Sequence, residues 1–161
     1  MPRLERVFCA TSWELEGERR AFYDTVGGVN EHHGIPAGVL FVAVTLTSVR
    51  DKRPLQYVIE ENIQDSTYYI LALDGDWGPT ERNFERDYYL ALEYRADPAR
   101  PMRHLELLLR SKPDGTPPEF SAELFARGIA HRVFRDTAGF QDLVRGLLLD
   151  WLPRQTDAAH T

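Results

Sequence analysis

The stretch Thr67–Leu73 reads TYYILAL, and apolar or aromatic residues occupy every position after the first. A strand that carries apolar side chains on both faces is typical of a parallel sheet covered by helices on both sides. Arg6–Ala10 (RVFCA) predicts another buried strand of this kind. We therefore expect these two strands in the centre of a parallel sheet, and the turn-rich segment Asp74–Pro79 as a loop at its edge.

Helical patterns alternate with the strands along the chain. The clearest one runs from Phe140 to Leu152, where apolar residues recur at intervals of three and four. Alternating strands and helices predict βαβ units. The sequence therefore indicates an α/β domain, a three-layer sandwich around a five-stranded parallel sheet in the order 2-1-3-4-5. The remaining strands are predicted at Val39–Thr47, His104–Leu109 and Ala130–Phe134, and the remaining helices start after Thr11, at Pro54, at Arg82 and at Ser121.

Length, charge and cysteine content narrow the class of protein. The 161 residues, with a net charge of −6, fit one domain over residues 1–153 and a flexible tail at 154–161. The 19 basic and 25 acidic residues are mixed without a basic stripe, so we expect no nucleic-acid partner. The longest apolar run, Ala37–Leu46, is too short to span a bilayer, so we expect no membrane insertion. The single cysteine, Cys9, suits a reducing cytoplasm.

The predicted topology nominates a ligand site. Ligands of open parallel sheets bind at the carboxyl ends of the strands, where the strand order reverses. In the order 2-1-3-4-5 this point lies between the first and third strands. No Gly-rich phosphate loop or dinucleotide motif follows the first strand. The candidate ligand-binding residues are Thr11, Ser12, Trp13, Asp74, Asp76 and Trp77.

The helix predicted from Arg82 adds acidic residues to the same edge. On a helix, Asp87 lies about 60° from the inward direction of Phe84, and Glu85 about 100° away on the other side. We therefore expect Asp87 to face the cleft as the candidate catalytic carboxylate, with Glu85 as the reserve, at the surface or bridging to a neighbour. The alternative is that both, like Glu81, only favour the helix dipole and solvate the loop, with Asp87 paired to an arginine such as Arg82 or Arg86.

The other candidates also have two interpretations. Trp13 and Trp77 are expected to flank the cleft and stack on a base, or else to pack between a helix and a loop. Thr11 and Ser12 could hold a phosphate or a ribose hydroxyl; alternatively, Thr11 caps the first helix in a capping box with Glu14. We expect no metal, because His32 and His33 have no third ligand at a suitable spacing.

Several stretches resemble an uncharacterised family of TIR-like domains. Val7–Leu15 (VFCATSWEL), followed by Glu18-Arg19, looks like the opening V-F-[VI]-S-S-T-x-x-D-L-x-x-E-R of that family. Pro54–Ser66 is similar to its segment from a P-L pair to I-x-x-S. Tyr69–Gly78 resembles its strand that ends in a G-x-x-Y-G loop, with Trp77 at the tyrosine. Glu85–Ala91 looks like its E-x-E-Y-x-x-A helix, and Phe140–Leu152 like its closing helix.

This resemblance implies a flavodoxin-like fold, shared with TIR and SEFIR domains and akin to nucleoside deoxyribosyltransferases. Members often precede NACHT- or STAND-type ATPases, which implies a signalling or defence module of prokaryotic immunity that forms a homo-oligomer or binds such an ATPase. Some TIR domains instead cleave NAD with a glutamate on the helix after the third strand, a position that Asp87 takes here. The alternative function is therefore an NAD glycohydrolase or related nucleoside-processing enzyme, with a small nucleotide as substrate and no cofactor required.

Overall fold

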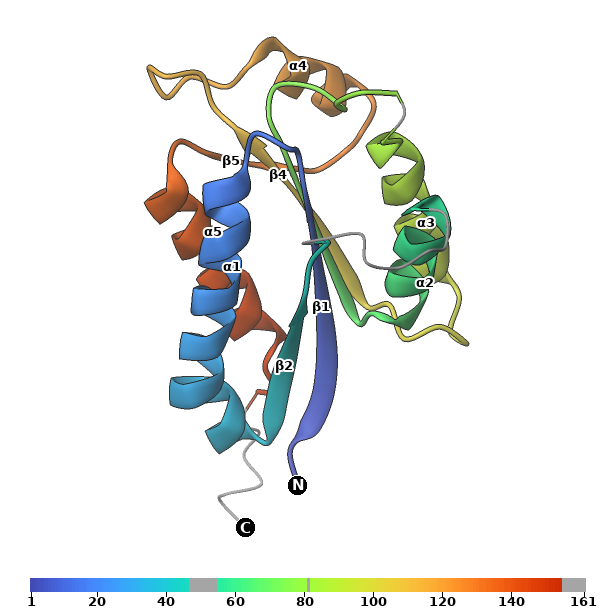
Figure 1. The fold of residues 1–161 in the computed structure, drawn as a ribbon, viewed down its shortest axis with the longest axis vertical. Helices are drawn as coiled ribbons and strands as arrows, with labels where there is room; N and C mark the ends of the chain where they lie inside the picture. Colours follow the sequence, from blue (N-terminus) through green and yellow to red (C-terminus); the bar gives the residue numbers. More distant parts are fainter. Residues whose placement is uncertain (47–54, 81, 155–161) are drawn as a thin grey trace.

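A computed structural model describes residues 1–46, 55–80 and 82–154. Within these residues, five strands form one parallel sheet in the order β2-β1-β3-β4-β5, as predicted. The strand β3 lies at the centre and β1 beside it, so neither of the two most apolar strands is at an edge (Figure 1). The strands are β1 (Arg3–Thr11), β2 (Val39–Val44), β3 (Tyr68–Leu73), β4 (His104–Arg110) and β5 (Arg132–Phe134).

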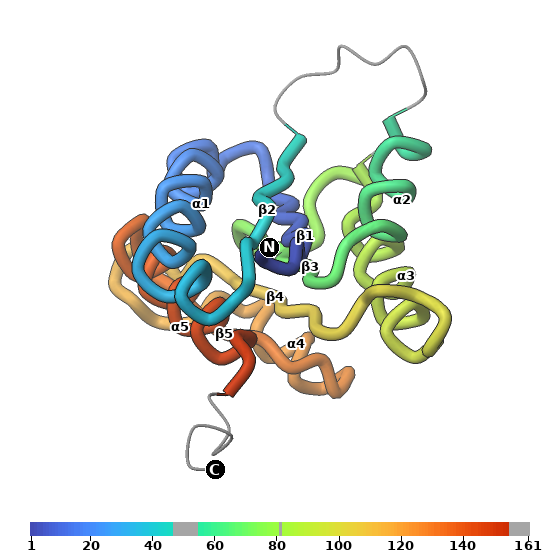
Figure 2. The backbone as a smooth tube through the Cα atoms, turned by 90° about the horizontal axis from the view of Figure 1, so that it is seen from below, coloured from blue at the N-terminus to red at the C-terminus, as the bar shows by residue number. Residues whose placement is uncertain are grey.

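Helices cover both faces of the sheet. In Figures 1 and 2, α1 and α5 lie on one face and α2 and α3 on the other. The short helix α4 lies near the carboxyl end of the strands (Figure 1). The helices are α1 (Glu16–Val29), α2 (Leu55–Asp65), α3 (Phe84–Ala96), α4 (Glu119–Ala126) and α5 (Thr137–Trp151), with the short turns η1 (Asn30–Gly34) and η2 (Ile35–Ala37) between α1 and β2.

The alternation of side chains along β3 explains why its sequence is apolar throughout. Tyr68, Ile70 and Ala72 belong to the core beneath α1 and α5. The alternate residues Tyr69, Leu71 and Leu73 belong to the second core, beneath α2, α3 and α4. All six residues of the strand are buried. Both layers of helices therefore pack directly on β3, which makes it the central strand.

The side chain of Asn30 pairs with the outer strand β2. Its Nδ2 donates to the carbonyl oxygen of Phe41 at 2.8 Å, and its Oδ1 accepts from the amide of Phe41 at 2.8 Å. Asn30 begins η1, the π-helical turn that follows α1. The two glycines Gly27 and Gly28 lie inside α1 and do not end it. The side-chain amide of Asn30 thus satisfies both backbone hydrogen-bonding groups of Phe41. Phe41 lies in β2, an edge strand whose outer side pairs with no other strand in the described residues.

The predicted capping box at Thr11 is wrong. Thr11 is the last residue of β1, where it pairs with Ala72 of β3. The helix α1 begins at Glu16, and its N-cap, Leu15, makes no side-chain cap hydrogen bond. The sheet holds the backbone of Thr11, so the chain needs four more residues before it can turn into the helix.

Other boundaries shift by a few residues, as expected where pairing and packing decide the ends. The strand predicted as Val39–Thr47 ends at Val44. Thr47 and Pro54 lie outside the described residues, as does the part of the predicted tail from 155 onward.

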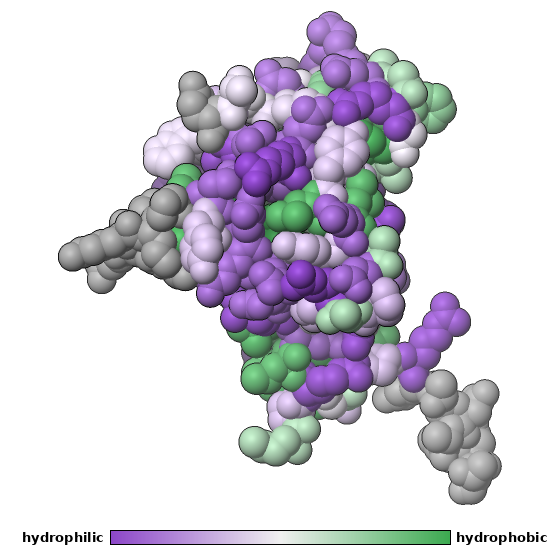
Figure 3. Space-filling view, turned by 90° about the vertical axis from the view of Figure 1, so that its right-hand side faces the viewer, coloured by the Kyte–Doolittle hydropathy of each residue, from purple (hydrophilic) through white to green (hydrophobic). Residues whose placement is uncertain are grey.

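The outer surface beside α2 and α3 is mostly hydrophilic (Figure 3). Among the described residues, no helix is long and apolar enough to cross a membrane.

Candidate functional site

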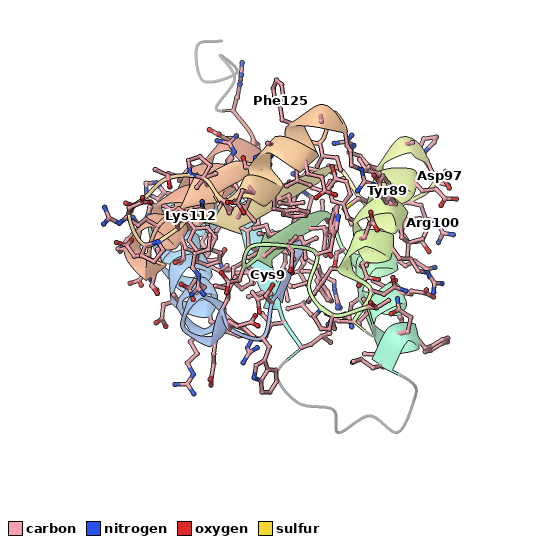
Figure 4. All side chains as sticks on the ribbon, turned by 90° about the horizontal axis from the view of Figure 1, so that it is seen from above. Cys9, Tyr89, Asp97, Arg100, Lys112 and Phe125 are labelled. Carbon is pink, nitrogen blue, oxygen red and sulfur yellow. The ribbon has the colours of Figure 1, made fainter. Side chains whose placement is uncertain are left out.

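Some of the candidate residues lie where the parallel strands end, and Figure 4 views this edge of the sheet from above. Ser12 and Asp74 follow β1 and β3, and the structure brings them together. The amide of Asp74 donates to Ser12 Oγ at 3.2 Å, and the amide of Ser12 donates to the carbonyl oxygen of Ala72 at 2.9 Å. Ser12 is almost fully buried. Its two hydrogen bonds connect the end of β1 to the end of β3. Thr11 lies beside it at the last pair of the ladder.

The carboxylate of Asp74 forms a bidentate ion pair with Arg110 at the end of β4. Arg110 Nε lies 2.9 Å from one carboxylate oxygen, and Nη2 lies 2.6 Å from the other. Arg110 was not among the candidates from the sequence, although the predicted strands Thr67–Leu73 and His104–Leu109 end just before Asp74 and Arg110. In the structure Leu73 pairs with Leu109, which places the next residue of each strand side by side. A bidentate pair fixes the orientation of both side chains.

The carboxylate of Asp87 lies inside the molecule between α2 and α3. Its exposed fraction is 0%. Gln56 Nε2 donates to Asp87 Oδ1 at 2.9 Å, and Arg82 Nη1 lies 3.4 Å from Oδ2. Helical phase predicted correctly that Asp87 turns inward, but its carboxylate is fully buried against Gln56 of α2 and does not face an open cleft. Of the two arginines that the structural alternative names, Arg82 pairs with Asp87 and Arg86 pairs with Glu60. The catalytic role of Asp87 stays a prediction.

The charge of Asp87, on α3, is compensated differently from that of Glu5, a buried carboxylate of β1. Burial raises the pKa of Asp87, against the hydrogen bond from Gln56 and the charge of Arg82, which lower it. Burial likewise lowers the pKa of the Arg82 guanidinium. Glu5, also buried, has closer partners: Arg3 at 2.8 Å, Arg103 at 3.1 Å and the Tyr68 hydroxyl at 2.8 Å. Asp87 is thus the less fully compensated of the two charges.

Tyr69 extends this buried group. Its ring belongs to the core beneath α2 and α3, and its hydroxyl is buried without a hydrogen-bond partner among the described residues. Burial raises the pKa of Tyr69 well above its usual value, and the charge of Asp87 raises it further. Sequence analysis treated this tyrosine only as part of an apolar strand. We call Asp87, Arg82, Gln56 and Tyr69 the buried polar cluster.

Glu85 lies at the surface, as its helical phase predicts. Its carboxylate accepts from Arg127 Nη1 at 2.8 Å, and the same guanidinium donates to the hydroxyl of Tyr89. Arg127 ends α4, so this contact joins α3 to α4. Glu85 is therefore the bridging residue that the sequence analysis expects, and it does not lie in the buried polar cluster.

The two tryptophans occupy different environments. Trp13 is 85% exposed. Trp77 packs instead between loop and helices, with its ring centroid 6.0 Å from Tyr88 of α3 and 5.4 Å from Phe120 of α4. Its indole nitrogen is buried, and no residue in the described ranges forms a hydrogen bond with it. Trp77 follows the packing alternative, and Trp13 has open space for a partner.

The remaining residues to locate are Asp76, Glu81 and Cys9, followed by the possible metal ligands. Asp76 is exposed, and its Oδ1 accepts from the amide of Gly78 at 2.7 Å, which stabilises the loop after β3. Glu81 lies outside the described residues. Burial raises the pKa of the Cys9 thiol to about 12, so this group is no nucleophile in the folded protein. The described part of the chain contains no group of three His, Cys, Asp or Glu side chains that could hold a metal ion.

The strand order and the helices on both faces define a flavodoxin-like α/β domain. A solved structure with a similar fold is the crystal structure of the RPS4 and RRS1 TIR domain heterodimer. The TM-score is 0.51 at 16% sequence identity, over 89% of this chain and 96% of that chain. At this identity the likeness shows a TIR-like fold. A scan against models of protein families found no match, and neither did a search of curated proteins.

Proposed function

We propose that this chain is a TIR-like signalling or defence module that works in the cytoplasm by binding a second copy of itself. The likeness of its fold to a TIR domain that was solved in complex with another TIR domain supports this proposal. An ATPase of the NACHT or STAND type is the further partner that the sequence resemblance implies. Kinship with nucleoside deoxyribosyltransferases rests on the same resemblance.

The observation that carries the proposal is the exposure of Trp13. The chain is anchored just before and two residues after it: Ser12 is bonded to β3, and Leu15, which is fully buried, donates its amide to the carbonyl oxygen of Ser12 at 3.0 Å. An exposed indole on a fixed backbone loses little conformational entropy when a partner covers it. Tryptophan is among the residues that contribute most to protein–protein binding when buried at an interface.

Sedimentation velocity over a range of protein concentrations tests this proposal. We expect the wild-type mass to rise with concentration. A tryptophan that contributes about 2 kcal/mol would make Trp13→Ala raise the dissociation constant about thirtyfold. Phe125→Ala is the matched control, because Phe125 is an aromatic side chain that is 82% exposed on α4. A monomer at every concentration, or equal effects of both variants, would contradict self-assembly through Trp13.

NAD cleavage is the second candidate function, and the buried polar cluster favours it. A carboxylate whose pKa is raised by burial, next to a buried tyrosine hydroxyl, is typical of functional sites as well as of structural ones. Hydrolysis of the N-glycosidic bond passes through an oxocarbenium-like state, which a carboxylate near the ribose stabilises. Because Asp87 is fully buried, a ribose could reach it only after the side chains that cover it move.

Incubation with NAD and chromatography for free nicotinamide test this second function. If Asp87 carries the reaction, Asp87→Asn abolishes nicotinamide release and Glu85→Gln leaves it unchanged. The assay is run on the assembled protein, at concentrations where sedimentation shows association. Release that persists in Asp87→Asn would assign the activity to other residues, and no release from the assembled wild type would reject it.

A further inference from the structure

A cavity of about 410 Å³ opens at the carboxyl edge of the sheet, on the β4 and β5 side. Its walls come from three places far apart in sequence: the loop after β3, the loop after β4 and the residue after β5. This volume lies within the range of sites for small ligands. None of the residues of the buried polar cluster lines the cavity. The lining includes Asp74, Arg110, Lys112, Pro113, Pro118 and Arg135.

The cavity carries positive charge on a protein that is negative overall. Three cationic side chains and one carboxylate line it, whereas the whole chain has a net charge of −6. Arg110 is neutralised by its bidentate pair with Asp74. Lys112 lies 3.2 Å from Glu119, whose side chain is 94% exposed, so that pair is screened by water. Within the described residues, Arg135 forms no ion pair and donates only to the carbonyl oxygen of Pro113, at 3.0 Å.

The loop that carries Lys112 is held in one conformation before any ligand binds. The backbone amide of Lys112 donates to the carbonyl oxygen of Thr116 at 2.9 Å, and the backbone amide of Gly115 donates to the carbonyl oxygen of Lys112 at 2.8 Å. Gly115 has a φ of +88°, and a Cβ built there would lie 3.6 Å from Arg135 Nη1. The carboxylate of Asp114 accepts two hydrogen bonds from Thr116. Arg135 therefore lies against an ordered turn.

We propose that this cavity binds a small phosphate-bearing anion. A guanidinium presents several N–H donors in a planar fork, which matches the oxygens of a phosphate, and an ammonium adds a mobile charge. Here Arg135 and Lys112 supply the two charges that Asp74 does not neutralise. Pro113 and Pro118 add small apolar surfaces and no donor, so the charged groups set the ligand class. Figure 4 looks onto this edge and labels Lys112.

Isothermal titration calorimetry with inorganic pyrophosphate, at low and at moderate salt, tests the proposal. We expect saturable binding at one site. Lys112→Gln with Arg135→Gln should weaken it at least about tenfold. Arg20→Gln is the matched control, because Arg20 is a 79% exposed arginine on α1, paired with Glu16 and outside the lining. Inorganic phosphate as a second probe shows whether one phosphoryl group is enough.

Amide chemical shifts of the wild-type protein locate the bound probe without any variant. Shifts centred on Gly75, Ser111 and Lys112 support the proposal. The proposal is overturned if pyrophosphate does not bind, if the shifts spread over other basic residues, or if Arg20→Gln weakens binding as much as the double variant. The double variant changes exposed or half-exposed side chains, and an unchanged unfolding temperature confirms its fold.

Discussion

Gln56 of α2 donates a hydrogen bond of 2.9 Å to the fully buried carboxylate of Asp87 on α3. This contact joins two helices that lie side by side on one face of the sheet (Figure 2). Arg82 approaches the same carboxylate from the other oxygen. The position that sequence analysis nominates for catalysis is therefore also a structural position, and its variants need a measure of stability beside any measure of activity.

Asp87→Asn and Asp87→Ala should differ in stability. Asparagine keeps the shape and can still accept from Gln56, and loss of the charge relieves the cost of burying it, so we expect a change within about 1 kcal/mol at neutral pH. Alanine leaves Gln56 and Arg82 without an acceptor, which should cost about 1–3 kcal/mol. Urea unfolding measures both. An alanine variant as stable as the asparagine variant would show that these hydrogen bonds contribute nothing.

The raised pKa of Asp87 predicts the direction of a pH effect. The folded protein holds this proton more tightly than the unfolded chain does. The contribution of Asp87 is therefore complete below the unfolded pKa, about 3.9, and is lost as the pH rises through the raised folded pKa. Unfolding free energies of wild type and Asp87→Asn, measured from pH 4 upward, should show wild type losing stability relative to the variant. Parallel curves would contradict the assignment.

Cys9 should not react with thiol reagents in the folded state. Burial raises its pKa to about 12, against a smaller opposing effect of the Arg19 charge, so the thiolate is scarce at neutral pH and reagent has no access. Ellman's reagent should label one thiol per chain in strong denaturant and none on the same timescale in buffer. Fast labelling in buffer would mean that β1 opens locally.

Gly34 and Gly28 should respond oppositely to alanine. A Cβ at Gly34 would lie 2.8 Å from the carbonyl oxygen of Val39, so the backbone must shift, and we expect a loss of about 1–3 kcal/mol. A Cβ at Gly28, inside α1, meets nothing within 4 Å, so alanine should gain about 0.5–1 kcal/mol there. Thermal unfolding compares the two. A gain at Gly34 would contradict the close packing of η1 against β2.

The sequence predicts the sheet well because its signal is local. The alternation of strands and helices predicts the parallel sheet, and the apolar runs of β1 and β3 predict that these strands are internal; the structure confirms both. The inward turn of Asp87 follows from helical phase alone. These features depend on period and not on distant contacts.

Sequence analysis is weaker where contacts between segments decide the structure. Thr11 has the residue type and spacing of a helix cap, yet its pairing with Ala72 keeps it in β1. Trp13 and Trp77 look equivalent in the sequence, and the difference comes from Tyr88 and Phe120, which pack on Trp77 only. Arg135 belongs to a cavity built from three separate loops, so no local pattern could reveal it.

The hydrogen bonds between Asn30 and Phe41 limit how the domain can associate. An unpaired outer strand is a template on which a strand of another chain can grow. On β2, the side-chain amide of Asn30 is bonded to the backbone N–H and the carbonyl oxygen of Phe41. An incoming strand would need these two groups for pairing. At the opposite end, β5 has only three residues, which is a short template. Both features disfavour growth of the sheet from one chain into another, which leaves the helices and loops as the surfaces through which two copies would associate.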